Sequence, residues 1–236
     1  MKRFYKDVSV EEADGGWQVL LDGRAIRTAG KNPQVVPSRA LAEAMAQEWA
    51  SQGDEIDTGA FMLRDLADYA LDVASGDARE ELAREIAAYA NTDTLCYRAD
   101  PDEPLYKRQR EVWEPMLAEA ENRYDARFER VSGIMHRPQP PETLDRMHGV
   151  VAAQDAFALA ALRMLTSLSA SLVIALAALE PDADPEALWQ AANLEEDWQA
   201  EHWGSDAEAL ELRQTRLDAF ALAMRFAAMA RDGQQA

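Results

Sequence analysis

The sequence predicts an α+β protein in which a small β-rich domain, residues 1–58, precedes a larger α-helical domain, residues 59–236. Turn-forming residues and short alternating apolar runs are concentrated in the first 37 residues, which is typical of antiparallel strands. From about residue 60 onward, apolar residues recur at helical spacing and strand-like alternation almost disappears. A chain of 236 residues suffices for one or two domains and needs neither disulfides nor metals to bury a core.

Turn signals define the elements of the β-rich segment. Asp14-Gly15-Gly16 marks a turn between two strands, and Asp22-Gly23 is a strong signal for a two-residue hairpin. Ser38 is placed to cap one helix over residues 38–52, which Gly53 ends. The expected strands cover residues 4–10, 17–21, 24–28 and 34–36.

The remainder of the chain is predicted to be helical apart from a strand-like alternation over residues 127–133. Pro115 is expected to kink or split one helix, because proline lacks a backbone donor. The apolar stretch 164–179 is shorter than the roughly 20 residues of a membrane span and contains hydroxyl side chains, so it predicts a buried helix. The expected helices cover residues 62–75, 77–91, 103–123, 141–164, 168–180, 184–203 and 206–230.

The charge balance narrows the classes of partner. The chain has 24 basic and 43 acidic residues, a formal net charge of −19. Nucleic acids and anionic membrane surfaces attract basic proteins, so neither is expected as a partner. Arg123, Arg127, Arg130 and Arg137 are interpreted as members of local ion pairs, not as an RNA-binding surface. The composition favours a partner that is neutral or basic.

The rarest residue types disfavour several kinds of chemistry. Cys96 is the single cysteine, and His136, His148 and His202 show no zinc-ligand spacing. Phosphate-loop, dinucleotide-binding and nucleophile-elbow motifs are absent from the sequence. The first residues resemble no leader peptide, so a bacterial cytoplasmic location is expected, or the mitochondrial matrix for a processed form.

Glu195 breaks the local pattern of its predicted helix. At 100° per residue over 184–203, Glu195, Gln199 and His202 fall on the apolar face, together with Trp198 and Trp203. One interpretation is a buried carboxylate paired with a cation, for which Arg213 on the apolar stripe of the next helix is the candidate. The other interpretation is an acid/base group, a metal ligand or a polar anchor in a binding surface.

A second group of polar residues lies at the end of one helix and along the next. Asp93 is suited to capping, Arg98 to pairing with Asp93 or a nearby carboxylate, and Cys96 is expected to be a buried, unreactive thiol. Gln109 and Trp113 are one helical turn apart, a spacing that packing alone also explains.

Three tracts resemble the ATP-twelve chaperone family, assembly factors for the catalytic head of F-type ATP synthase. They are NTDTLCYR at residues 91–98, PLYKRQREVWEP at 104–115 and LEEDWQAEHWG at 194–204. The N-terminal phrases FYKDVSV and VLLDGRAIRT are also similar to that family. Residues 61–67 depart from it, because they lack the proline and threonine of its corresponding stretch.

The resemblance implies a chaperone without catalytic activity or a cofactor. Such a protein binds the unassembled alpha subunit and shields the surface that later meets the beta subunit. The family pattern E-x-x-x-Q-x-x-x-W-G maps onto Glu195, Gln199, Trp203 and Gly204. A monomer is expected. The residues expected to matter for function are Glu195, Gln199, Trp203, Gly204, Asp93, Arg98, Gln109 and Trp113.

Two alternatives belong to other classes of protein. One is a metal-carboxylate or acid/base enzyme that uses Glu195, His202 and Asp93. The other is a generic helical scaffold for protein interaction.

Overall fold

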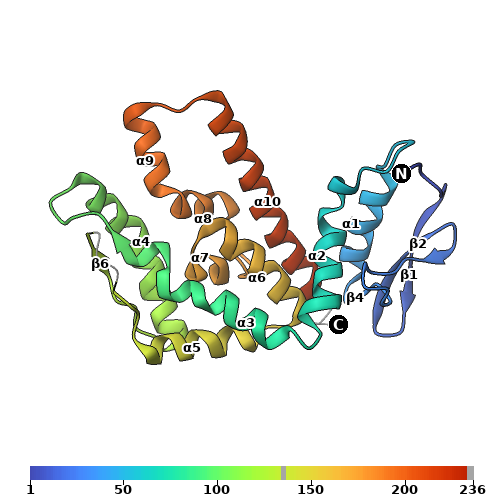
Figure 1. Ribbon diagram of the computed structural model, residues 1–236, viewed down its shortest axis with the longest axis horizontal. Helices are drawn as coiled ribbons and strands as arrows, with labels where there is room; N and C mark the ends of the chain where they lie inside the picture. Colours follow the sequence, from blue (N-terminus) through green and yellow to red (C-terminus); the bar gives the residue numbers. More distant parts are fainter. Residues whose placement is uncertain (134–136, 233–236) are drawn as a thin grey trace. The chain divides into compact units, whose positions relative to one another are not determined.

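The computed structural model describes residues 1–133 and 137–232 and confirms the predicted fold class: strands come first and helices follow (Figure 1). The chain forms two compact units. The first comprises Met1–Arg79, Asp155–Ala161 and the C-terminal residues from Arg225, and the second comprises Glu80–Gln154 and Leu162–Met224. The predicted domain boundary between residues 58 and 59 lies within a 3₁₀ turn, Thr58–Ala60, and as a domain boundary it stays a prediction.

The first unit contains a four-stranded antiparallel sheet with β2 at its centre. Strand β2 pairs with β1 in the register Val8↔Leu21, and its other edge pairs with β3 and then with β4. The predicted hairpin at Asp22-Gly23 is confirmed, since both residues have positive φ, as this turn type requires. The strands are β1 (Val8–Ala13), β2 (Gly16–Leu21), β3 (Arg24–Ala25) and β4 (Val35–Val36).

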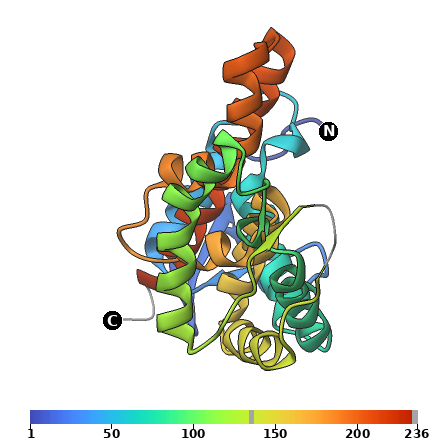
Figure 2. The same ribbon diagram turned by 90° about the vertical axis from the view of Figure 1, so that its left-hand side faces the viewer.

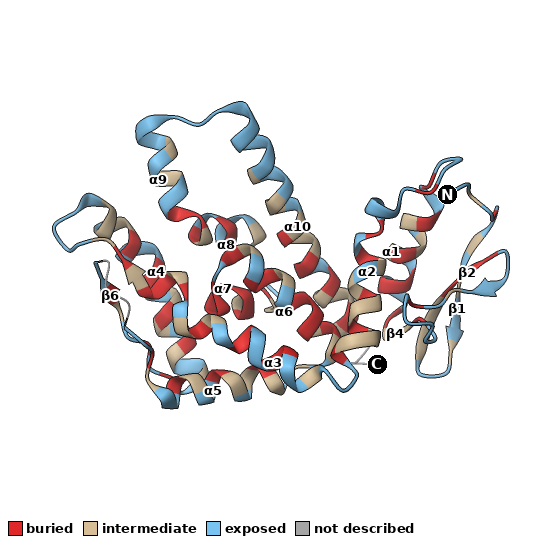
Figure 3. Cartoon of the chain, in the orientation of Figure 1, coloured by how far each residue is buried: buried red, intermediate tan, exposed pale blue. Residues whose placement is uncertain are grey.

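Helix α1 (Arg39–Ala50) packs on this sheet. The Ser38 hydroxyl accepts from Leu41 N–H at 3.0 Å, which confirms the predicted N-cap. Met45 and Trp49 lie on the same side of α1 as Leu41, and all three are buried (Figure 3). Helix α2 (Met62–Tyr69) follows a short 3₁₀ turn (Thr58–Ala60) and continues as a π-helical segment (Ala70–Ala74).

The second unit is built from helices around a core that includes Trp113, Trp189 and Phe220. One short parallel pair, β5 (Tyr97–Arg98) with β6 (Val131–Ser132), joins distant parts of the chain. Helices α6 and α10 contribute residues to both units. The helices are α3 (Arg79–Ala87), α4 (Pro104–Tyr124), α5 (Pro141–Ala152), α6 (Ala156–Ser169), α7 (Leu172–Ala177), α8 (Pro185–Ala192), α9 (Leu194–Trp203) and α10 (Ala207–Asp232), with 3₁₀ turns at Ala88–Thr92 and Thr94–Cys96.

Two predicted helix boundaries were wrong because small polar residues cap new helices. The helix expected over 141–164 is interrupted, since the Asp155 carboxylate accepts from the N–H of Phe157 at 2.8 Å and starts α6. That helix continues to Ser169, where Ala170 adopts a positive φ of 51°. Ser171 then caps α7 by accepting from Ile174 N–H at 3.0 Å.

The helix expected over 184–203 is also two helices. Asn193 leaves helical geometry at φ −107° and ψ 22°, and its amide donates to the Trp189 carbonyl at 2.8 Å. The break resets the helical phase between α8 and α9. In contrast, Pro115 does not split α4, which continues to Tyr124 with Trp113 and Leu117 fully buried on either side of the proline.

The apolar stretch 164–179 covers the end of α6, the break after it, α7 and the two residues that follow α7. Its polar side chains are satisfied locally, as Thr166 donates to Leu162 O at 2.8 Å and Ser169 donates to Leu165 O at 2.7 Å. Of the helices in the described parts of the chain, none combines the length and apolar character that crossing a membrane requires.

Candidate functional site

Helix α4 organises the residues that the sequence singles out. Its buried face carries Gln109, Trp113 and Leu117 at four-residue spacing, so the three side chains lie along one side. The indole Nε1–H of Trp113 donates to the Ala191 carbonyl at 2.8 Å and attaches the end of α8 to α4. Trp113 therefore supports the fold.

Gln109 connects α4 to the first turn of α9. Its Nε2 donates to Glu195 Oε1 at 2.5 Å, and its Oε1 accepts from Ala99 N–H at 2.9 Å. Gln109 is fully buried, whereas Glu195 is exposed except where its carboxyl group meets α4. Desolvation raises the pKa of the Glu195 carboxyl group, and the hydrogen bond from Gln109 opposes that shift.

The predicted partner of Glu195 was wrong. Arg213 donates to Asp197 at 2.7 Å instead. The apolar stripe on which Arg213 was placed is buried only in its later part, since Phe220 is inaccessible but Leu210 is 54% exposed. The start of α10 therefore does not belong to the core.

The predicted apolar face of 184–203 was also wrong, because the break at Asn193 separates its two halves. In α9 only Leu194 is buried. Gln199, His202 and Gly204 are exposed, and Trp203 is 79% exposed. Helix α9 therefore presents these residues to solvent.

Asp93 and Arg98 form a second buried group. Asp93 is inaccessible and accepts from Leu95 N–H at 3.1 Å and from Val173 N–H at 3.0 Å, so it caps two helical segments. Burial raises the pKa of Asp93 to about 6, against the opposing effect of these hydrogen bonds. Arg98 pairs with Glu114 at 2.8 Å, the nearby carboxylate that was one of its two predicted partners.

Neighbouring side chains complete this second group. Burial raises the pKa of Cys96, which keeps the thiol protonated at neutral pH. Of the four arginines expected in ion pairs, Arg123 contacts Glu180 and Arg130 contacts Glu114 and Glu121, whereas Arg127 and Arg137 form no ion pair within the described residues. We call Asp93, Arg98, Gln109 and Trp113 the buried network.

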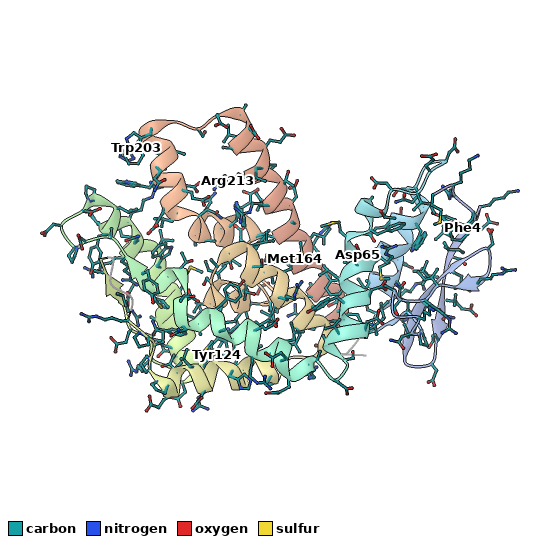
Figure 4. The ribbon with its side chains drawn as sticks, in the orientation of Figure 1. Phe4, Asp65, Tyr124, Met164, Trp203 and Arg213 are labelled. Atoms are coloured by element: carbon teal, nitrogen blue, oxygen red, sulfur yellow. The ribbon has the colours of Figure 1, made fainter. Side chains whose placement is uncertain are left out.

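The other predicted residues lie on a projecting part of the second unit, residues 194–213, which we call the arm. It comprises α9, the connection 204–206 and the first two turns of α10, and both ribbon views show these two helices rising together from the rest of the unit (Figures 1 and 2). Figure 3 shows that most of the arm is exposed, and Trp203 lies at the outer end of α9 (Figure 4). Leu210, which was predicted to belong to an apolar stripe, and Leu212, which the sequence did not single out, are 54% and 59% exposed.

The metal-carboxylate and acid/base alternatives depend on Glu195, His202 and Asp93. Within 1–133 and 137–232, no three His, Cys, Asp or Glu side chains are placed to hold a metal ion. Both carboxylate oxygens of Asp93 accept backbone hydrogen bonds, while His202 Nδ1 contacts the Trp198 carbonyl at 2.7 Å. His136 lies outside the described residues.

Comparisons with known proteins give concordant matches. The sequence profile described as "ATP12 chaperone protein" matches residues 2–121. Protein atp12, mitochondrial, of Schizosaccharomyces pombe is 24% identical over 222 residues, which cover 89% of this chain and 76% of that protein. The crystal structure of Atp12 from Paracoccus denitrificans is 35% identical, covers 97% of this chain and 98% of its own, and superposes with a TM-score of 0.90. The Atu1473 protein of Agrobacterium tumefaciens is 40% identical, with coverage of 97% and 85% and a TM-score of 0.89.

Proposed function

The chain belongs to the ATP12 chaperone family, and from this premise we propose that it assists assembly of the F-type ATP synthase catalytic head. Its client is the unassembled alpha subunit. The chain binds this subunit, shields the surface that later contacts the beta subunit, and is then replaced by the beta subunit. It acts as a monomer, without catalysis and without a cofactor.

The observation that carries this proposal is the apolar exposure of the arm. Trp203 and Leu210 are more than half exposed on the arm of a chain whose net charge is −19. Apolar surface that is exposed together on one segment marks interaction sites, and tryptophan is enriched at protein interfaces. An unassembled subunit also exposes apolar interface surface, which promotes aggregation. The acidic residues keep the complex soluble while the apolar side chains cover that surface.

Glu195 serves as a polar anchor for the client at the base of the arm. Gln109 holds the Glu195 carboxylate by one oxygen, Oε1. No ion pair holds Glu195 within the described residues, and a basic group of the client supplies the charge that this desolvated carboxylate needs.

The alternative of a metal enzyme has a direct chemical test. Stoichiometric iron, manganese or zinc in freshly purified protein would favour the metal-carboxylate class over the chaperone class. The bacterial cytoplasm is the proposed location, or the mitochondrial matrix for a chain from a eukaryote.

Co-expression with the alpha subunit alone tests the main proposal. The soluble fraction of the alpha subunit is expected to rise severalfold when this chain is present, and the two proteins are expected to purify together. If the soluble fraction is the same with and without the chain, the proposed function is wrong.

Glu195→Gln tests the anchor. Glutamine still offers an oxygen to Gln109, so the fold is retained while the charge is lost. Capture of the alpha subunit is expected to fall, whereas the matched variant Glu211→Gln, at an exposed position of α10, leaves it unchanged. If both variants capture the alpha subunit equally well, Glu195 is not an anchor for the client.

A further inference from the structure

A groove of about 800 Å³ lies in the second unit at the base of the arm, lined by residues of α4, α8, α9 and α10. Its apolar lining consists largely of small side chains, such as Ala187, Ala191 and Ala200, together with Leu194. Small side chains leave space that larger side chains of another molecule can occupy. Leu210, which is 54% exposed, stands at the rim of the groove.

Acidic side chains outnumber basic ones at the rim of the groove. Arg108 donates to both carboxylate oxygens of Glu201 at 2.5 and 2.9 Å, and Arg213 pairs with Asp197. These pairs neutralise both arginines that line the groove, while Glu196 adds a further negative charge. Residues 194–213 as a whole contain seven acidic residues and a single basic one, Arg213.

This combination of shape and charge points to one kind of occupant. A second copy of the chain would also carry a charge of −19, so electrostatic repulsion disfavours it. An apolar side chain flanked by cations satisfies both the apolar lining and the acidic rim. We propose that the groove binds a segment of the client subunit in which an apolar residue is flanked by Lys or Arg. This proposal rests on the proposed function and assigns it a docking site.

The chain offers a matched pair of leucines for the test. Leu210 lines the groove, whereas Leu212, two residues along α10 and 59% exposed, does not. An aspartate at either position meets solvent, so both variants are expected to fold as the unchanged chain does. Leu210→Asp is expected to reduce the amount of alpha subunit that co-purifies by at least tenfold, and Leu212→Asp by less than twofold.

A charge-reversal pair provides a second measurement if Leu210→Asp fails to fold. Glu196 lines the groove and Glu208 does not, although both are exposed. Glu196→Lys is expected to reduce capture severalfold more than Glu208→Lys. Because a charged rim is screened by salt, capture by the unchanged chain is also expected to weaken when ionic strength rises from about 0.1 M to 0.5 M.

The outcomes separate the two proposals. If the unchanged chain does not capture the alpha subunit, the proposed function fails. If it does capture the alpha subunit, but the groove variants capture as much as their matched controls, the docking site is overturned and the function stands. Loss of capture confined to Leu210→Asp and Glu196→Lys supports the docking site.

Discussion

The buried network and the arm both contain residues from the tracts that resemble the family, but these residues have different roles in the two regions. Asp93, Arg98, Gln109 and Trp113 are buried, and each bonds to a backbone or side-chain group of another segment. Gln199, Trp203 and Gly204, together with most of Glu195, face solvent. The first group holds the second unit together, and the second group is free to contact another protein. The tracts that resemble the family thus contain both structural residues and surface residues. Only their burial in the structure distinguishes the two kinds.

The largest effect is expected for Trp113→Ala. The change removes a fully buried indole and its hydrogen bond to Ala191 O, so the free energy of unfolding is expected to fall by about 3–5 kcal/mol. Urea denaturation followed by circular dichroism measures this loss. A loss below about 1 kcal/mol would mean that Trp113 does not stabilise the fold, and the distinction between the buried network and the arm would then be wrong.

Gln109→Leu tests the link between the network and the arm. Leucine has a similar volume, but it leaves the Ala99 N–H without its acceptor and Glu195 without its donor, at a cost of about 1–3 kcal/mol. The same denaturation assay applies. Glu195→Gln is the control, with an expected change within about 0.5 kcal/mol, since its amide oxygen replaces the acceptor. Similar losses in both variants would mean that Glu195 is itself structural.

A smaller, pH-dependent effect is expected at Asp93. Its pKa of about 6 in the folded protein lies above the ordinary value of about 3.9, so the folded protein binds this proton more tightly than the unfolded chain does. The stability that Asp93 contributes is therefore present at low pH and is lost as pH rises through about 6. Between pH 5 and pH 7.5, the free energy of unfolding of the unchanged chain should fall by about 1 kcal/mol relative to that of Asp93→Asn. If the free energy of unfolding of the unchanged chain, relative to that of Asp93→Asn, stays constant or rises over this pH range, the raised pKa of Asp93 is wrong.

The smallest effect on stability is expected for Trp203→Ala. The side chain is 79% exposed, so the free energy of unfolding should change by less than about 0.5 kcal/mol. Capture of the alpha subunit should nevertheless fall severalfold, because exposed tryptophans commonly contribute much of the binding energy at interfaces. Stable protein with unchanged capture would exclude Trp203 from the binding surface. Trp113→Ala and Trp203→Ala together test the same substitution in the buried network and in the arm.

The sequence predicted the fold class and most helices because their signals are local. The Asp22-Gly23 turn and the Ser38 cap depend on neighbouring residues only, and both were found where expected. The break at Asn193 was missed because asparagine also occurs within helices, and the apolar pattern continues through it. That single miss placed Glu195, Gln199 and Trp203 on a buried face and led to the wrong partner, Arg213. The true contact, Gln109 with Glu195, joins residues 86 positions apart and has no local signal.

The exposed leucines were missed for a related physical reason. Leu210 continues the apolar spacing of α10, and spacing alone does not reveal where a helix leaves the core. Burial along α10 begins only near Phe220, beyond the arm. Tertiary structure therefore decides which part of one apolar stripe is core and which part is available to a partner.

We expect the client to bind the arm. Hydrogen–deuterium exchange of the chain, alone and in complex with the alpha subunit, tests it most directly, because it reports protection along the whole backbone in one measurement. Exchange in residues 194–213 is expected to be slower in the complex, while the strands within residues 8–25 exchange as they do in the free chain. Slower exchange confined to the strands, with no change in the arm, would contradict it.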